Sequence, residues 1–400
     1  MTIHRKESTH PQLLILLLLV SFASVGAVLF TPGLPAITSF FNLSTAEAQL
    51  TITTYLVGYA LGQLPYGPLA NRFGRKKTLY IGISLSILGS LLCAISGSIS
   101  FGVLVFARFL QALGASVGLK ISFTMVADVY NQTDSTKIFS RIIMAFAIMP
   151  GLAVAIGGWL IHLLNWQSCF YFLALFGGLM LWLSTRLPET SKSLDSNALN
   201  IRSVLHSYGV MFKNPRLVIS GLVMGCGSAV VYIFASKAPF IGINLIGLSP
   251  KVFGTYNLIP LLGMLSGSIL AMKLAGRFSF QFFLLSGILS AFVASFGMLV
   301  PFSIGIINSV SLFFPMVFIY MAEAVVFSNI SSFGLTNAKN KSNGSAVMNF
   351  INLGTTVIAV LLSELIYPES LILMPLSFIF FFSFMLVLWV ILKNLDPILE

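Results

Sequence analysis

Four ionisable residues lie inside long apolar stretches of this sequence, where charged side chains are rare. They are Arg108, Lys120, Lys237 and Glu323. A charge at such a depth in a membrane-spanning helix is costly, and by default it marks a path for a solute or a proton. We predict that Glu323 carries a proton or pairs with one of the lysines, a static internal salt bridge being the alternative. Glu364, near the end of its apolar stretch, is expected at the membrane interface.

The composition requires apolar surroundings for most of the chain. Of the 400 residues, 57% are hydrophobic and 8% are charged, whereas a soluble domain carries about 25% charged residues. The sequence has no G-x-x-x-x-G-K-[ST] phosphate loop, no catalytic triad and no Cys/His cluster. Its three cysteines, Cys93, Cys169 and Cys226, lack metal-ligand spacing. We therefore expect a membrane protein without enzyme activity, metal or cofactor.

Twelve apolar stretches are each long enough to cross a bilayer, which takes about 20 residues in a helix. Spanning segments must satisfy their own backbone hydrogen bonds, so these stretches are helices. The sequence predicts an all-α integral membrane protein with twelve transmembrane helices in two six-helix halves. The predicted spans are 12–37, 46–69, 78–97, 101–127, 138–163, 167–187, 217–244, 250–274, 280–300, 306–335, 344–366 and 371–393.

The longest polar stretch separates the sixth span from the seventh. It predicts an N-terminal six-helix half at 1–187, a cytoplasmic linker with some amphipathic helix at 188–216, and a C-terminal six-helix half at 217–400. Spans two and eight both carry a Thr-Tyr pair and a GxxxG pattern, which lets helix backbones approach closely. This echo favours a parallel repeat of two six-helix units.

The basic residues predict the orientation in the membrane. If the N-terminus is inside, 18 of the 22 Lys and Arg residues lie in cytoplasmic segments, and Lys251 is the one in an outside loop. This bias is a strong positive-inside signal. It predicts a multi-pass protein of the bacterial inner membrane with both termini in the cytoplasm. It also accounts for the net charge of +11 without nucleic acid.

A basic motif follows span two: Gly67-Pro-Leu-Ala-Asn71-Arg72-Phe-Gly74-Arg75-Lys-Lys. It resembles the loop signature of the major facilitator superfamily, G-x-L-A-D-R-x-G-R-K. The resemblance implies twelve helices, a substrate site between the halves and a cytoplasmic gate at this loop. Glycine permits the tight turn, and the cations can pair with carboxylates and helix C-termini. Asn71 stands where the family has Asp, which puts an ion-pair latch through that position in doubt.

Span four carries a second resemblance to this family. The segment 108–118 (RFLQALGASVG) is similar to its R-x-x-Q-x-x-G-x-x-x-G pattern. The family's matching Arg is associated with proton coupling, and the alternative for Arg108 is a structural tie to neighbouring carbonyls. Asp128 ends the span and resembles the acid that relatives place there. Arg72 or Arg75 could reach it at the gate, unless Asp128 is simply a solvated loop acid.

Span five contains Pro150-Gly151 and Gly157-Gly158. These residues resemble the end of the family's antiporter signature, G-P-x-x-G-G, with a longer gap. Two interpretations stay open, a hinge of an antiporter and close packing of small residues against another helix.

Further residues resemble the Bcr/CflA drug-resistance branch, a group of drug:proton antiporters. They are Ala238-Pro239-Phe240 and the stretch 247–254 (GLSPKVFG), which match S-P-F and G-L-S-P-x-x-F-G. Relatives of this branch often carry an Asp in span one. Here Val28 takes that place, so a proton site built on that acid is not expected.

The favoured function is proton-coupled efflux of a small molecule or drug by alternating access. The expected partners are a small-molecule substrate, protons and the lipid bilayer, with no nucleic acid, and the protein is expected to be a monomer. Three buried cations against one central acid also suit an anion transporter, an exporter or symporter of a carboxylate such as a siderophore or metabolite. A non-transporting membrane sensor or assembly partner is a third possibility.

Overall fold

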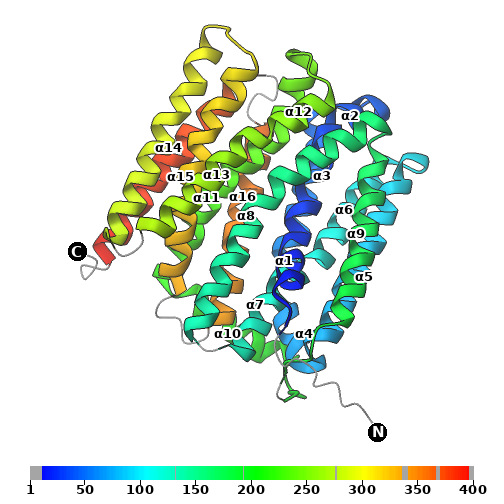
Figure 1. Ribbon diagram of the computed structural model, residues 1–400, viewed down its shortest axis with the longest axis vertical. Coiled ribbons are helices and arrows are strands. Elements are labelled where there is room, and N and C mark those ends of the chain that lie inside the picture. The colour runs from blue at the N-terminus through cyan, green and yellow to red at the C-terminus, as the bar shows by residue number, and fades with distance from the viewer. Residues whose placement is uncertain are drawn as a thin grey trace.

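The computed structural model describes residues 11–130, 132–191, 193–274, 277–335, 341–365 and 370–395. All regular structure in these ranges is helical, as the sequence predicts. Figure 1 shows the helices running roughly alongside one another between two ends. We call the end with the helices α4 (Tyr66–Phe73) and α10 (Ile201–Phe212) the linker end, and the end with α2 (Leu34–Phe41) and α12 (Pro250–Tyr256) the far end.

The first half contains six helical units, and each falls on a predicted span. Several units are broken helices, because prolines or glycines interrupt the backbone hydrogen bonds. The elements are α1 (Leu13–Val28) with η1 (Thr31–Gly33) and α2; α3 (Thr45–Gly62) with α4; α5 (Arg75–Ile95) with η2 (Ser96–Ser98); α6 (Phe101–Ala115) with α7 (Val117–Val129); α8 (Gln132–Leu163); and α9 (Gln167–Thr185).

The second half also contains six helical units in the described part of the chain. Its elements are α11 (Pro215–Pro239) with the π-helical η3 (Phe240–Leu245); α12 with α13 (Leu258–Leu274); α14 (Phe280–Ser303); α15 (Ser309–Leu335); α16 (Lys341–Leu365); and α17 (Leu373–Leu395).

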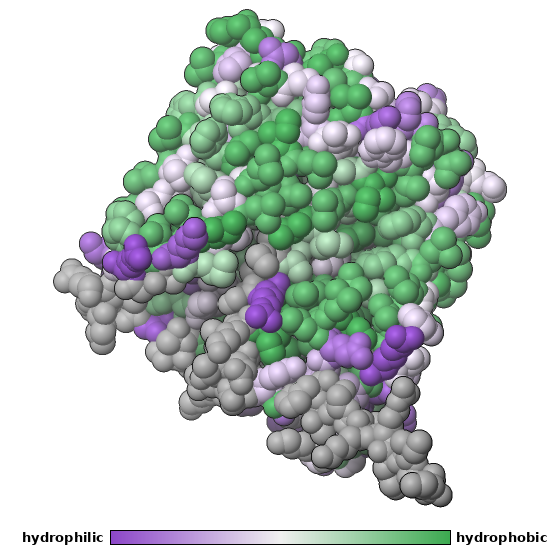
Figure 2. All heavy atoms as spheres, in the orientation of Figure 1, coloured by the Kyte–Doolittle hydropathy of each residue, from purple (hydrophilic) through white to green (hydrophobic). Residues whose placement is uncertain are grey.

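The twelve-helix prediction is therefore confirmed. Ten of the units in the described part of the chain are long and apolar enough to cross a bilayer. The other two are α3 with α4 and the long helix α8, of which the stretch Ile148–Leu163 is apolar. Figure 2 shows a broad apolar band over the middle of one face, with hydrophilic side chains gathered mostly toward the two ends. Such a band is the surface that lipid chains cover.

The two halves meet along two helix pairs. On one side α8 packs against α12 and α13, and on the other α3 packs against α16. The helix α10 lies between the sixth and seventh units and contacts α11 and α16. The Tyr208 hydroxyl of α10 donates to the carbonyl of Leu64, at the break between α3 and α4 (2.8 Å). The linker helix thus touches both halves at the linker end.

Candidate functional site

A cavity of about 640 Å³ lies between the halves. The first half contributes residues of α1, η1, α3 and α8, and the second half contributes α11, α12, α13, α15 and α16. Its lining includes Arg141 and Met272, which are exposed and lie toward the linker end of α8 and α13. The cavity is therefore reached from the linker side. A binding site between two repeats near mid-membrane is the usual arrangement in secondary transporters.

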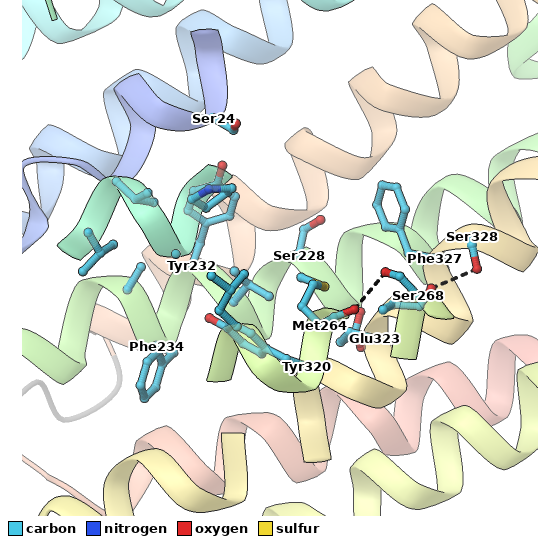
Figure 3. A pocket seen from close by; sticks show the side chains of 18 of the residues that line it. Ser24, Ser228, Tyr232, Phe234, Met264, Ser268, Tyr320, Glu323, Phe327 and Ser328 are labelled. Atoms are coloured by element: carbon cyan, nitrogen blue, oxygen red, sulfur yellow. Dashed lines mark hydrogen bonds between the residues drawn. The ribbon is translucent and has the colours of Figure 1, made fainter. Parts of the chain in front are cut away.

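Helical periodicity explains which side chains line this cavity. On α15 most of the lining residues recur at intervals of three and four and so share one face: Tyr320, Glu323, Ala324, Phe327, Ser328 and Ser332, with Asn329 beside them. The same spacing holds for Ser228, Val231, Tyr232 and Ala235 on α11. Figure 3 shows aromatic rings from both helices beside the short polar side chains Ser228 and Ser268. The lining is mostly apolar and aromatic, with a few polar groups.

Among the described residues of the lining, the acid is Glu323. Its side chain is 5% exposed, and its Oε1 atom has no hydrogen-bond partner in the described structure. The carboxylate lies directly against Gly227 of α11, where a Cβ atom would collide with Oε2. Glycine at that position therefore makes the space that the carboxylate occupies. An isolated carboxylate in such surroundings is costly unless it takes a proton or faces a cation.

The two buried lysines do not line this cavity. Lys120 of α7 is 6% exposed and packs near Gly67, whose Cβ would lie 3.3 Å from the lysine Cε. Lys237 is in the last turn of α11 and donates to the carbonyl of Ser363 of α16 (3.1 Å). The structure therefore does not bring the lysines together with Glu323 around one solute. The side chain of Glu364 lies outside the described residues.

Arg108 is fully buried in the first half and does not line the cavity either. Its guanidinium donates to three backbone carbonyls: Gly26 (2.8 Å) and Ala27 (3.3 Å) of α1, and Thr51 (3.1 Å) of α3. The Arg108 Cζ atom also lies 4.1 Å from the centre of the Tyr55 ring, a cation–π distance.

These contacts are the structural tie that the sequence left open as an alternative. The helix α1 ends two residues after Gly26, so the carbonyls near its end lack N–H partners within the helix. The five-donor fork of Arg108 satisfies them and connects α1, α3 and α6 at one point. Because α1 also carries the cavity residues Ser24 and Val28, Arg108 helps to position the cavity wall.

The predicted gate loop forms an ion pair with Asp128. The Arg75 Nε atom donates to Oδ2 of Asp128 at 2.8 Å, and an NH2 hydrogen donates to Oδ1 at 3.3 Å. Arg75 also donates to the carbonyl of Ala70 (3.0 Å). Of the two arginines proposed to reach Asp128, the structure selects Arg75. Arg72 makes no ion pair within the described residues.

A residue that the sequence did not single out completes this cluster. Both oxygens of Glu189 accept backbone N–H groups at the start of α5, from Arg75 and from Lys76 (3.0 Å each). Gly74 has φ +91°, which glycine adopts without strain, and a Cβ there would lie 2.6 Å from Glu189 Oε2. The sequence feature that could have drawn attention to Glu189 is the polar Pro-Glu-Thr segment just after span six.

The charge of Glu189 is stabilised by its donors. Burial alone would raise its pKa, but the N–H groups of Ser191, Arg75 and Lys76 and the Arg75 charge outweigh burial. Its pKa is therefore held below the ordinary value of 4.5. The neighbouring Thr190 hydroxyl donates to Asp128 (2.9 Å), and the N–H of Asp195 donates to the carbonyl of Asn71 (3.0 Å). The first residues of the linker are thus bound to the gate loop.

The far end is closed by glycine contacts between the halves. Gly158 of α8 faces the carbonyl of Pro250, and a Cβ on Gly254 of α12 would lie 3.2 Å from the Cα of Gly158. Beside them, the Lys251 ammonium lies 3.9 Å from the centre of the Trp159 ring. The small residues predicted in span five therefore pack against the other half, and the structure is closed at this end.

The other small residues predicted in span five, Pro150, Gly151 and Gly157, also lie on α8. Pro150 and Gly151 line the cavity, and Gly151 faces the side chain of Leu261 on α13. Gly157 faces the carbonyl of Leu29, just after α1. Close packing explains these glycines in the observed conformation.

Comparison with known proteins agrees with this geometry. The sequence profile of the Major Facilitator Superfamily matches residues 16–361. The chain belongs to this superfamily.

Several curated relatives of this superfamily member carry drug-resistance names, among them the following two. Multidrug resistance protein D of Escherichia coli is 26% identical over 79% of this chain and 78% of its own length. The bicyclomycin resistance protein homolog of Haemophilus influenzae is 24% identical over 67% of each chain. Matches to other relatives span between 58% and 67% of their lengths. The predicted Bcr/CflA-type resemblance is confirmed at this modest identity.

The fold is that of solved superfamily structures. The crystal structure of a D-xylose-proton symporter is 16% identical, covers 93% of this chain and 96% of its own, and has a TM-score of 0.75. Two residues that depart from the expected family motifs can be placed in the structure. Val28 lines the cavity, and the amide oxygen of Asn71 accepts from an NH1 hydrogen of Arg75 at 3.5 Å.

Proposed function

We propose that this superfamily member exports a small molecule in exchange for protons by alternating access. The single observation that carries the proposal is the cavity between the halves. It is reached from the linker side and closed at the far side, and its described lining contains the buried carboxyl group of Glu323. The names of the drug-resistance relatives support a small organic substrate.

We further propose that the linker end faces the cytoplasm, with both termini inside and residues 188–216 serving as the linker between the halves. The support is the 18 basic residues predicted on that side. In this orientation the observed conformation receives substrate from the cytoplasm. The Arg75–Asp128 and Glu189 contacts at the gate loop lie on the same side.

Glu323 is the proposed proton carrier, because Val28 leaves span one without an acid and Glu323 is the carboxyl group in the described lining. Protonation removes the cost of a buried, unpartnered charge, and loss of the proton restores it. The carboxyl can therefore couple its proton to the occupation of the cavity.

The alternative of anion transport receives less support. It rested on three cations around one acid, but Arg108, Lys120 and Lys237 do not line the cavity. The described lining holds one cation, the exposed Arg141, and one acid. An anion would meet an apolar wall and a carboxyl group in the inner part of this cavity.

The test is a substrate screen in proteoliposomes with an imposed pH gradient. The expected result is uptake or release of at least one organic solute that collapses when the gradient is dissipated. In the Glu323→Gln protein we expect gradient-driven transport to be lost while exchange of substrate across the membrane persists. Gradient-driven transport at the unaltered rate by Glu323→Gln protein would refute its role as proton carrier. A chain that moves no solute of any charge would favour the sensor or assembly role.

A further inference from the structure

The linker helix α10 has an apolar face that no other part of the described protein covers. Its members are Ile201, Leu205 and Phe212, which are 74%, 64% and 41% exposed. Their spacing of four and seven residues places them on one side of a helix with 3.6 residues per turn. Large apolar side chains gathered on one exposed face are typical of a surface that meets a membrane or another protein.

A basic face follows the apolar face around α10. Arg202, His206 and Lys213 repeat the same spacing one residue further along, and all three are exposed. Residues 196–216 contain no Asp or Glu. Around the helix, the apolar face lies between the protein-facing side, where Tyr208 is buried, and this basic face. This order is typical of a helix in the membrane interface, with its apolar side toward the acyl chains and its cations at the headgroups.

The contacts of α10 place it at the depth where the membrane spans end. The Tyr208 hydroxyl donates to the carbonyl of Leu64, which lies within a predicted span (2.8 Å). The Phe212 ring lies edge to face against the Phe350 ring, with 6.1 Å between the ring centres. Phe350 belongs to the apolar part of α16 that is long enough to cross a bilayer. A helix held by these contacts lies at the boundary between the bilayer and water.

We propose that α10 is an interfacial helix that binds anionic phospholipids of the leaflet at the linker end. Ile201, Leu205 and Phe212 contact the acyl chains, and Arg202 and Lys213 contact the phosphate headgroups. The bilayer is the favoured occupant because α10 packs beside the membrane-spanning helices α11 and α16, and because its basic face complements the negative charge of a lipid surface. This surface lies outside the transport cavity and requires no transported solute.

The first measurement determines which side of α10 meets the acyl chains. The full-length protein in lipid nanodiscs carries a fluorophore on Leu205→Cys or, separately, on Ser203→Cys, an exposed position on the opposite side of the helix. The native cysteines are buried. We expect lipids with brominated chains to quench the label at Leu205, and iodide in the water to quench the label at Ser203. Equal access of iodide to both labels would overturn the proposal and would favour a soluble protein as the partner of the apolar face.

The second measurement tests the preference for anionic headgroups. The nanodiscs contain phosphatidylglycerol and phosphatidylcholine, and the brominated chains are placed on one of the two lipids at a time. We expect brominated phosphatidylglycerol to quench the label at Leu205 more strongly than brominated phosphatidylcholine. One Lys or Arg near an anionic surface is worth roughly a fivefold preference. Arg202→Gln combined with Lys213→Gln should therefore lower the lipid preference by about fivefold or more, and added salt should weaken it in the unaltered helix.

The control is Lys273→Gln, the loss of an exposed cation in the last turn of α13, which packs against α8 and α15. It should leave the lipid preference at Leu205 unchanged. Equal quenching by the two lipids in the unaltered helix would overturn the headgroup site, and so would a preference that survives the double substitution. Neither measurement requires transport, so a failure of the proposed function would leave both results standing.

Discussion

A methyl group added at the far end should open this protein toward the far side. Gly254→Ala places a Cβ 2.8 Å from the carbonyl oxygen of Val154 and 3.2 Å from the Cα atoms of Ala155 and Gly158. All three atoms belong to the backbone of α8 in the other half, so no side chain can rotate away. The helices must separate by about 0.6 Å before the nearest distance reaches the 3.4 Å at which ordinary contact begins.

The added methyl group destabilises only the conformation that is closed at the far end. Forced overpacking in a close-packed contact costs about 1–3 kcal/mol. Because this contact joins the two halves, the strain is relieved when the far end opens and the packing within each half is untouched. A difference of this size shifts a two-state equilibrium by roughly 5-fold to 150-fold. Alanine is also the better helix former by about 0.5–1 kcal/mol, so the folded state itself should not be weakened.

The shift can be measured by spin-label distances across the far end. Labels at Leu163 of the first half and Leu245 of the second half are suitable, because both side chains are exposed. The native cysteines are buried. We expect Gly254→Ala to increase the population with a long label distance. Gly178→Ala, where a Cβ would meet nothing within 4 Å, is the matched control. A distance distribution unchanged by Gly254→Ala would refute the role of the Gly254 contact in closing the far end.

Three further predictions concern the linker end. Asp128→Asn removes the charge that Arg75 contacts and should lower the free energy of unfolding by about 1.5–3 kcal/mol, measured by thermal or chemical denaturation; an unchanged stability would contradict the structural role of the pair. Glu189 has a lowered pKa, so its contribution to stability is complete above the ordinary value of 4.5 and is lost as the pH falls through the lower, folded value. The unaltered protein should therefore lose more stability on acidification below pH 4.5 than Glu189→Gln, and parallel pH profiles would disprove this. Reporter fusions should place both termini in the cytoplasm, and a periplasmic C-terminus would rule out the proposed orientation.

The hydropathy of the sequence was sufficient to predict the helices. Each of the twelve predicted spans coincides with a helix or a broken helix pair, because bilayer thickness sets the length of an apolar segment. Local motifs also predicted the gate loop, where Arg75 meets Asp128. The motif also predicted a tight turn at its glycines. Gly74 has φ +91°, a backbone conformation that a residue without a side chain adopts easily.

The partners of the buried charges required the tertiary structure. From the sequence, either Lys120 or Lys237 could pair with Glu323, and Arg108 was placed on the same substrate or proton pathway. In the structure Arg108 binds carbonyls of α1 and α3, Lys237 faces α16, and Glu323 lines the cavity. The role of Glu189 at the start of α5 depends on a contact between segments more than a hundred residues apart.

The sequence does not reveal these partners because the apolar pattern of a membrane helix does not show which of its faces is buried. In water, an apolar stripe shows which face of a helix is buried. In a bilayer, lipid and protein interior are about equally apolar, and helices associate through packing and local hydrogen bonds. A helix such as α15 is therefore apolar on nearly all sides, and its sequence does not show which face meets the cavity. The depth of Glu323 could be read from the sequence, but the neighbours that face it were decided by the packing of α11, α13, α15 and α16.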